Sequence, residues 1–197
     1  MARQAELSAL LREVGALMDG HFLLSSGRHS PAYVEKFRLL QHPEQTERLC
    51  RLIADWFRDD PDGQGGPELV AGPTTGGVIL SYEVARLLGL RGIFAEKAAG
   101  GRAFQRGFEI RPGERTLIVD DVLTTGGSIR DVIEAVRRAG GEPIGVGVLV
   151  DRSGGRTDFP DGRGGSLPFF ACLELDLPTY GEGACPLCDD GVPLTVT

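Results

Sequence analysis

Two adjacent carboxylates, Asp120 and Asp121, close an apolar run and are followed by Thr124, Thr125 and the tripeptide Gly-Gly-Ser at 126–128. Where a strand leads into a helix, unpaired backbone N–H groups and the helix dipole favour an anion. The glycines let the backbone approach a phosphate closely, and the hydroxyl groups supply further donors. The carboxylates suit sugar hydroxyls or a hydrated Mg²⁺ instead. A phosphate, a vicinal diol and a metal side by side describe a phosphorylated ribose.

A turn with a helix cap is the structural alternative for this stretch, and one glycine-rich turn alone would be weak evidence for a ligand. Two acids at the end of a buried strand are harder to explain in that way, because burying charge is costly. The sequence also lacks the G-x-x-x-x-G-K-[ST] of a Walker loop and the G-x-G-x-x-G of a dinucleotide turn. The interpretation as a phosphoribose site is therefore favoured.

Alternating strand-like and helical segments position these residues. Strands are predicted at 68–73, 91–97, 115–123 and 143–151, and helices at 76–89 and 127–141. This order predicts an α/β fold with a mainly parallel sheet covered on both faces. Ligands collect beyond the carboxyl ends of such strands. Three loops fall there, at 72–77, 96–107 and 120–128.

The N-terminal part has a different pattern. Apolar residues between Leu7 and Met18 follow helical spacing and predict an amphipathic helix that Gly20 ends, and those between Leu49 and Phe57 predict a second helix. A polar loop rich in Gly and Pro then marks a boundary near residue 65. We expect an N-terminal segment at 1–65, a core at 66–152 and a C-terminal segment at 153–197.

Charge and hydropathy narrow the partners. The chain has 197 residues and a net charge of -7 without a cluster of Lys and Arg, so a nucleic-acid partner is disfavoured. No apolar run approaches the ~18 residues that a membrane span needs, and the first residues lack the pattern of a secretion signal. The expectation is a cytoplasmic protein without a membrane partner.

The four cysteines do not form a disulfide framework at this chain length. Cys50 lies on an apolar helical face and Cys172 in a strand-like run, so both are expected in the core. Cys185 and Cys188 form a C-x-x-C, but a four-thiolate zinc site needs a second pair that the other two cysteines cannot supply by their spacing. A structural turn is the favoured interpretation there, ahead of metal or redox chemistry.

The sequence LIVDDVLTTGGS at 117–128 closely resembles the 5-phosphoribosyl-1-pyrophosphate (PRPP) motif of type I phosphoribosyltransferases. The resemblance implies their fold, a mainly parallel sheet flanked by helices with a small hood built from N-terminal and C-terminal segments. It places the 5′-phosphate in the loop from Thr124 to Ser128, and the ribose hydroxyls and water-bound Mg²⁺ at Asp120 and Asp121. The short loop GPTTGG resembles the loop that holds the pyrophosphate in this family, and FAEKAAGGRAFQRGF at 94–108 stands where the family has its mobile catalytic loop, with Lys97 as the implied catalytic cation. The implied PRPP-binding residues are Thr75, Gly76, Arg102, Arg106, Asp120, Asp121, Val122, Leu123, Thr124, Thr125, Gly126, Gly127 and Ser128.

The hood is the part that selects the base in this family. GHFLLSSGRHSPAYVE at 20–35 resembles the hood of the orotate phosphoribosyltransferases, VLVDRSGG at 148–155 carries an arginine where those enzymes hold orotate, and CPLCDDGVPL at 185–194 is similar to one bacterial branch. Lysines of the better-known enzymes are replaced by Ser25 and Gly76, and the mobile loop lacks their further lysine and histidine. The implied orotate-binding residues are Phe22, Ser26, Gly27, Arg28, Tyr33, Thr124 and Arg152.

The resemblance implies transfer of the phosphoribosyl group from PRPP to orotate, giving orotidine 5′-monophosphate and pyrophosphate in de novo pyrimidine biosynthesis. It also implies a Mg²⁺-dependent homodimer whose mobile loop reaches the neighbouring active site. Two alternatives remain open at this point. A purine-using phosphoribosyltransferase would keep the core but would not need the hood or Arg152, and a non-catalytic PRPP sensor should carry a basic recognition module.

Overall fold

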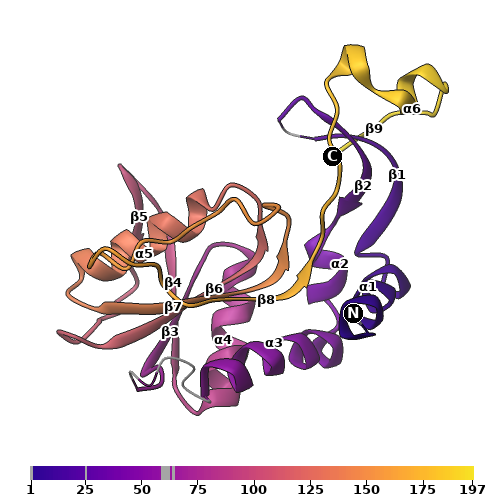
Figure 1. Cartoon of the computed structure of the whole chain (residues 1–197). Coiled ribbons are helices and arrows are strands. Elements are labelled where there is room, and N and C mark those ends of the chain that lie inside the picture. The colour runs from indigo at the N-terminus through magenta and orange to yellow at the C-terminus, as the bar shows by residue number, and fades with distance from the viewer. Residues whose placement is uncertain (1, 25, 59–62, 64) are drawn as a thin grey trace.

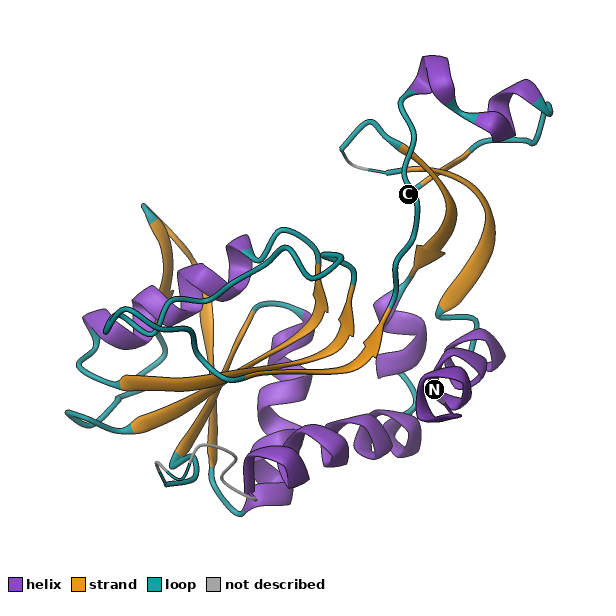
Figure 2. Cartoon of the chain, in the orientation of Figure 1, coloured by secondary structure: helices purple, strands orange, loops and turns teal. Residues whose placement is uncertain are grey.

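The apolar runs predicted as strands form the middle of a six-stranded sheet in a computed structural model that describes residues 2–24, 26–58, 63 and 65–197 (Figures 1 and 2). The strand order is β5-β4-β3-β6-β7-β8, and all neighbours pair in parallel except β4 and β5, which form an antiparallel hairpin. The α/β prediction is thereby confirmed. The strands are β3 (Leu69–Pro73), β4 (Arg91–Ala98), β5 (Gly101–Phe104), β6 (Arg115–Leu123), β7 (Glu142–Asp151) and β8 (Phe169–Glu174).

Helices cover both faces of this sheet (Figure 2). Successive residues of a strand point to opposite faces, so Val70 and Leu117 join one core cluster while Ala71 and Ile118 join the other. Cys50 and Cys172 are fully buried in the first cluster, as predicted. The first face is covered by α1 (Ala2–Glu13), α3 (Pro43–Arg58) and α4 (Gly76–Leu88), and the second by α5 (Gly127–Arg138). Within the described part of the chain, none of the helices has the length and apolar character to cross a membrane.

The first helix is shorter than its spacing predicts. Gly15 adopts a left-handed conformation (φ 68°), and the N–H of Ala16 donates to the carbonyl of Leu11, which closes the helix by a C-terminal glycine motif. The prediction that the helix continues to Gly20 was therefore wrong. Met18 and Gly20 lie in β1 (Leu17–Leu23), where pairing with a second strand takes precedence over helical spacing.

A second, smaller sheet stands apart from the main one (Figure 1). Its order is β2-β1-β9, with β1 antiparallel to β2 (His29–Val34) and parallel to β9 (Thr195–Val196). The short helices η1 (Glu182–Ala184) and α6 (Pro186–Asp189) lie at its far end, and α2 (Lys36–Leu40) leads from β2 back to the core. We call residues 17–34 and 181–197 the hood, since they bring together the two ends of the sequence.

Candidate active site

A cleft of about 1110 Å³ lies between the carboxyl ends of β3, β6 and β7 and the hood. This is the edge of a parallel sheet where loops lead into helices and ligands collect. The cleft brings together predicted residues of both the PRPP and the orotate sets. Those that line it are Ser26, Arg28, Tyr33, Thr75, Asp120, Asp121, Val122, Thr124, Thr125, Ser128 and Arg152.

The predicted phosphate loop, residues 124–128, connects β6 to the first turn of α5. Gly126 has a φ of 77°, and a Cβ at this position would lie 2.7 Å from Cγ2 of Thr157, so the turn needs glycine. Arg130 braces the loop by donating to the carbonyl of Thr125 at 2.7 Å. Among the described residues no side chain caps α5, which leaves its first N–H groups available to an anion.

The two carboxylates lie beside this loop and are both buried, at 8% exposure for Asp120 and 2% for Asp121. Burial raises the pKa of both groups, and the charge of Asp121 raises that of Asp120 further. Asp121 Oδ1 accepts a hydrogen bond from the N–H of Val122 at 2.7 Å and lies 3.2 Å from Nζ of Lys36, which lowers the pKa of Asp121 against the effect of burial. Asp121 Oδ2 is buried and finds no hydrogen-bond partner in the part of the chain that the structure describes. A carboxylate oxygen left in this condition fits a hydrated Mg²⁺ or a sugar hydroxyl.

The predicted pyrophosphate loop ends β3 next to Asp121. Thr75 lines the cleft, and the peptide bond between Thr74 and Thr75 is cis. Gly76 faces Asp121 so closely that a Cβ at position 76 would come within 1.6 Å of Asp121 Oδ2. The absence of a lysine at Gly76 therefore has a steric explanation, because no side chain fits there while Asp121 keeps its position. The other departure, Ser25, lies outside the described residues.

The orotate side of the cleft is formed by the hood and the end of β7. Arg152 is partly buried, which lowers its pKa, and its Nε is a buried donor without an acceptor among the described residues. Tyr33 lines the same cleft. Phe22 is buried with its ring centroid 5.7 Å from that of Tyr33, so it supports Tyr33 from behind instead of lining the cleft. Arg28 lines the cleft while its Nε donates to Thr179 Oγ1 at 2.8 Å.

The turn of the hood completes this side. Ser26 is exposed and lines the cleft, whereas Gly27 forms the turn itself, with a φ of 74° and an N–H that donates to the carbonyl of Leu24 at 2.8 Å. Leu123, Gly126 and Gly127 likewise shape the backbone around the cleft without lining it.

The cations of the predicted mobile loop lie in three different settings. Arg102 is buried at 5% exposure and donates to Thr74 Oγ1 at 3.0 Å and to Ser128 Oγ at 3.4 Å, so it joins the two anion loops from behind. Arg106 pairs with Glu96 at 2.8 Å on the surface, and Lys97 is exposed on the β4–β5 hairpin. Of the residues that the structure describes, neither Arg106 nor Lys97 lines the cleft of its own chain.

Several cleft residues were missed by the sequence reasoning. Lys36, Arg130 and Arg156 bring positive charge to the cleft, and Thr157 and Thr179 bring hydroxyl groups. Lys36 could have been singled out from the sequence, because it is one of only two lysines, Lys36 and Lys97. Arg130 and Arg156 could not be singled out in this way, because the chain has many arginines.

Known proteins resemble the chain over most of its length. The family described as phosphoribosyl transferase domain matches residues 38–161. The orotate phosphoribosyltransferase of Pelotomaculum thermopropionicum is 47% identical over 188 residues, which are 95% of this chain and 93% of the relative. The enzyme of the same description from Thermus thermophilus is 46% identical over 186 residues, which are 94% of this chain and 96% of the relative.

Solved structures agree with these sequence relatives. The crystal structure of orotate phosphoribosyltransferase from Mycobacterium tuberculosis has a TM-score of 0.68 and 28% identity, covering 88% of this chain and 97% of that chain. The enzyme from Aeropyrum pernix has a TM-score of 0.67 and 28% identity, covering 86% of this chain and 93% of that chain. An adenine phosphoribosyltransferase from Leishmania tarentolae, at 18% identity and a TM-score of 0.60, shares the fold.

Proposed function

The chain belongs to the orotate phosphoribosyltransferases, and we propose that it transfers the 5-phosphoribosyl group of PRPP to orotate as a Mg²⁺-dependent, cytoplasmic homodimer. The products are orotidine 5′-monophosphate and pyrophosphate, in pyrimidine biosynthesis. One observation carries the assignment of the site: a single cleft joins the loop 124–128, the carboxylates Asp120 and Asp121, and Arg152, whose buried Nε has no acceptor among the described residues.

Each part of PRPP and orotate has matching chemistry in the cleft. The 5′-phosphate binds the N–H groups of 124–128 and the hydroxyls of Thr124, Thr125 and Ser128. The ribose hydroxyls bind the carboxylates Asp120 and Asp121, which can only accept when ionised. The orotate carboxylate binds Arg152, since a guanidinium donates two parallel hydrogen bonds to a carboxylate. Tyr33 offers an aromatic face to the pyrimidine.

Catalysis rests on charge placement and on exclusion of water. Orotate N1 loses its proton and attacks the anomeric carbon, while the bond from that carbon to pyrophosphate breaks. The transition state resembles an oxocarbenium ion, and no covalent enzyme intermediate forms. Asp120 and Asp121 would hold Mg²⁺ through water, and the ion would supply positive charge to the departing pyrophosphate. Asp120 and Asp121 hold the ribose, and Arg102 holds the loops that carry Thr74 and Ser128 in fixed positions beside the leaving group.

The homodimer accounts for the position of Lys97. Because Lys97 is exposed on a projecting hairpin and lies outside the cleft of its own chain, we propose that it enters the cleft of a second copy. Gly100 and Gly101 have φ values of 78° and 130° at the tip of that hairpin, where the chain must turn sharply. Closure of this loop would bring a cation to the pyrophosphate only when the substrate is present.

The test is the loss of orotate absorbance on mixing the protein with orotate, PRPP and Mg²⁺. We expect turnover that stops when PRPP is omitted or Mg²⁺ is chelated, and no turnover with adenine or hypoxanthine. Turnover of a purine instead of orotate would overturn the substrate assignment. Binding of PRPP without turnover of any base would overturn the assignment as an enzyme.

A further inference from the structure

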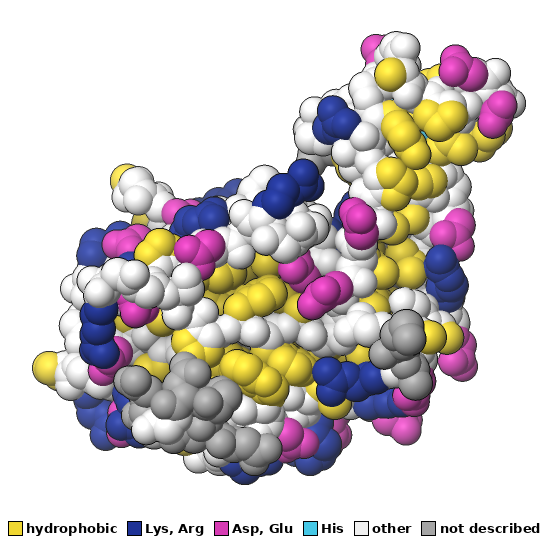
Figure 3. Space-filling view, in the orientation of Figure 1, with side chains coloured by type: hydrophobic (Ala, Val, Ile, Leu, Met, Phe, Trp, Pro, Cys, Tyr) yellow, Lys and Arg dark blue, Asp and Glu magenta, His cyan; other side chains and the backbone are white. Residues whose placement is uncertain are grey.

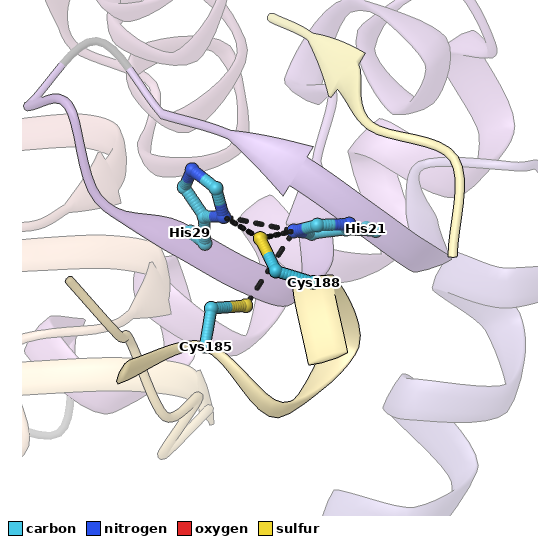
Figure 4. A group of neighbouring side chains, drawn as sticks. All are labelled: His21, His29, Cys185 and Cys188. Atoms are coloured by element: carbon cyan, nitrogen blue, oxygen red, sulfur yellow. Dashed lines mark hydrogen bonds between the residues drawn. The ribbon is translucent and has the colours of Figure 1, made fainter. Parts of the chain in front are cut away.

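Four potential metal ligands converge in the hood (Figure 4), and none of them lines the cleft. His21 comes from β1, His29 from β2, and Cys185 and Cys188 from the C-terminal segment around α6. One ligand atom from each side chain lies within 4.8 Å of all the others. Cys185 Sγ lies 3.5 Å from His21 Nε2, Cys188 Sγ lies 3.3 Å from His29 Nδ1, and the two ring nitrogens are 2.9 Å apart.

These separations suit a tetrahedral ion. Zinc bonds of about 2.3 Å to sulfur and about 2.0–2.1 Å to nitrogen require ligand atoms about 3.3–3.8 Å apart. The separations in the cluster scatter around that range, so small rotations of the side chains suffice to place all four atoms at bonding distance. Two thiolates with two imidazoles select zinc, whereas Mg²⁺ and Ca²⁺ take oxygen ligands.

The hydrogen bonding of His21 also supports a zinc site. Its Nδ1 lies 2.8 Å from the carbonyl oxygen of Val192, which can only accept, so Nδ1 carries the proton. Nε2 then presents a lone pair to the two sulfur atoms and to His29. Histidines that bind metals usually donate their other ring N–H to a carbonyl or carboxylate in this way, which fixes the tautomer and the orientation of the ring.

Residues 181–197 need such a link, because little apolar burial holds them. Between residues 181 and 197, all of which the structure describes, Cys185 is the one buried residue. Val192, Leu194 and Val196 remain 36%, 42% and 76% exposed, and hydrophobic side chains stay visible along the hood in Figure 3. Small segments that cannot bury a core are commonly stabilised by a metal or a disulfide.

We propose that His21, His29, Cys185 and Cys188 bind one Zn²⁺ that fastens the C-terminal segment to the β1–β2 hairpin. On binding, both thiols lose their protons, two protons are released per zinc, and the two thiolates balance the charge of the ion. Four protein ligands leave no open position, so the site is structural. The sequence alone favours a turn at Cys185 and Cys188 because it offers no second pair of cysteines; in the structure two histidines supply that pair.

Zinc at this site should also affect the KM for orotate, and this expectation rests on the proposed function. The hairpin that carries His21 and His29 also carries Tyr33 and Arg28 into the cleft, and Arg28 is held by Thr179 of the C-terminal segment. Loss of zinc should therefore raise the KM for orotate several-fold more than the KM for PRPP. The loop that binds the phosphate of PRPP belongs to the main sheet and not to the hood.

The direct test measures zinc without reference to activity. The reduced full-length protein, first stripped with a chelator, is titrated with Zn²⁺ against a chromogenic chelator, and its melting temperature is recorded with and without the metal. We expect one zinc per chain and a higher melting temperature with zinc. Loss of an outer hydrogen-bond partner typically weakens metal sites about 10- to 100-fold, so removing a ligand in Cys188→Ser should weaken zinc by more than about 100-fold.

Two further variants keep the test decisive. Cys188 is exposed, so Cys188→Ser should fold, and Cys185→Ser provides a second removal of a ligand. His42→Ala is the matched control, because His42 is the remaining histidine of the chain and is exposed. Equal zinc affinity in wild type, Cys188→Ser and Cys185→Ser would overturn the proposal, as would reduced wild-type protein that takes up no zinc. Normal zinc binding in a protein without orotate turnover would overturn the proposed function alone.

Discussion

Lys36 Nζ lies 3.2 Å from Asp121 Oδ1, and this contact joins the first residue of α2 to the carboxylate pair of β6. The side chain of Asp121 is 3% exposed and that of Lys36 is 39% exposed, so a buried acid is paired with a partly solvated base. Burial raises the pKa of Asp121 and Lys36 lowers it, which means that Lys36 helps to keep Asp121 ionised. Lys36 also brings positive charge to a cleft that must receive a highly anionic substrate.

Lys36→Gln should therefore lower kcat/KM for PRPP roughly 10- to 150-fold, the range for loss of a hydrogen bond of about 1.5–3 kcal/mol to a charged group. Steady-state kinetics with PRPP as the varied substrate measures this. Lys36→Arg is the matched control and should retain most of the activity, since it keeps the charge. A kcat/KM for PRPP in Lys36→Gln equal to that of the wild type would show that Lys36 has no role in PRPP binding or catalysis.

Arg152→Ala should weaken orotate far more than PRPP. The guanidinium is partly buried with an Nε that has no acceptor among the described residues, and replacing it removes the partner proposed for the orotate carboxylate. We expect the KM for orotate to rise roughly 10- to 150-fold, equivalent to about 1.5–3 kcal/mol, with a small change for PRPP. Arg163→Ala, an exposed arginine paired with Glu142, is the control. Equal weakening of both substrates would show that Arg152 has a structural role.

Glu114 lies at the end of the sheet opposite the cleft and should make the folding stability of the protein depend on pH. Burial alone would raise its pKa, but the N–H of Arg111 and the guanidinium groups of Arg91 and Arg111 lower it to about 2. A lowered carboxyl pKa contributes stability above its ordinary value of 4.5, and this contribution is lost as the pH falls through that value toward 2. Stability at neutral pH should therefore depend on the charge of Glu114.

Glu114→Gln should accordingly lower the melting temperature at pH 7 by several degrees, since 1 kcal/mol corresponds to about 2–4 °C in a chain of this size. The difference from wild type should shrink between pH 4.5 and pH 3, while both KM values stay unchanged at moderate temperature. Glu109→Gln, at an exposed position, is the control. A difference that does not change with pH would mean that packing, and not charge, holds Glu114.

The core could be predicted from sequence because its strands are buried on both faces. Leu117, Ile118 and Val119 are all fully buried, so β6 appears in the sequence as a continuous apolar run, and the phosphate loop follows it directly. The end of α1 was predicted wrongly because Leu17 and Met18 continue the helical spacing. Their place in β1 is decided by the pairing of Leu17 with Val34, a contact that local periodicity does not contain.

The remaining parts of the site depend on residues far apart in the sequence. His21 and Cys185 are 164 positions apart and meet only because the C-terminal segment returns to the hood. The contact between Lys36 and Asp121 likewise requires the fold. Spacing rules detect ligands that share a segment, which is why Asp120 and Asp121 were found and the histidine pair was not.

The β4–β5 hairpin provides the last prediction, because Lys97 is exposed there and outside the cleft of its own chain, at least among the residues described. If Lys97 contacts the pyrophosphate mainly in the transition state, when negative charge develops on the pyrophosphate, Lys97→Ala should lower kcat much more than it raises the KM for PRPP. Asp121→Asn should lower turnover by orders of magnitude while the fold survives. Mixing the two inactive variants should then restore activity, because a heterodimer has one cleft with an intact Asp121 and an intact Lys97 from the other subunit. Heterodimers that form without recovering activity would place Lys97 in its own subunit's site or outside the mechanism.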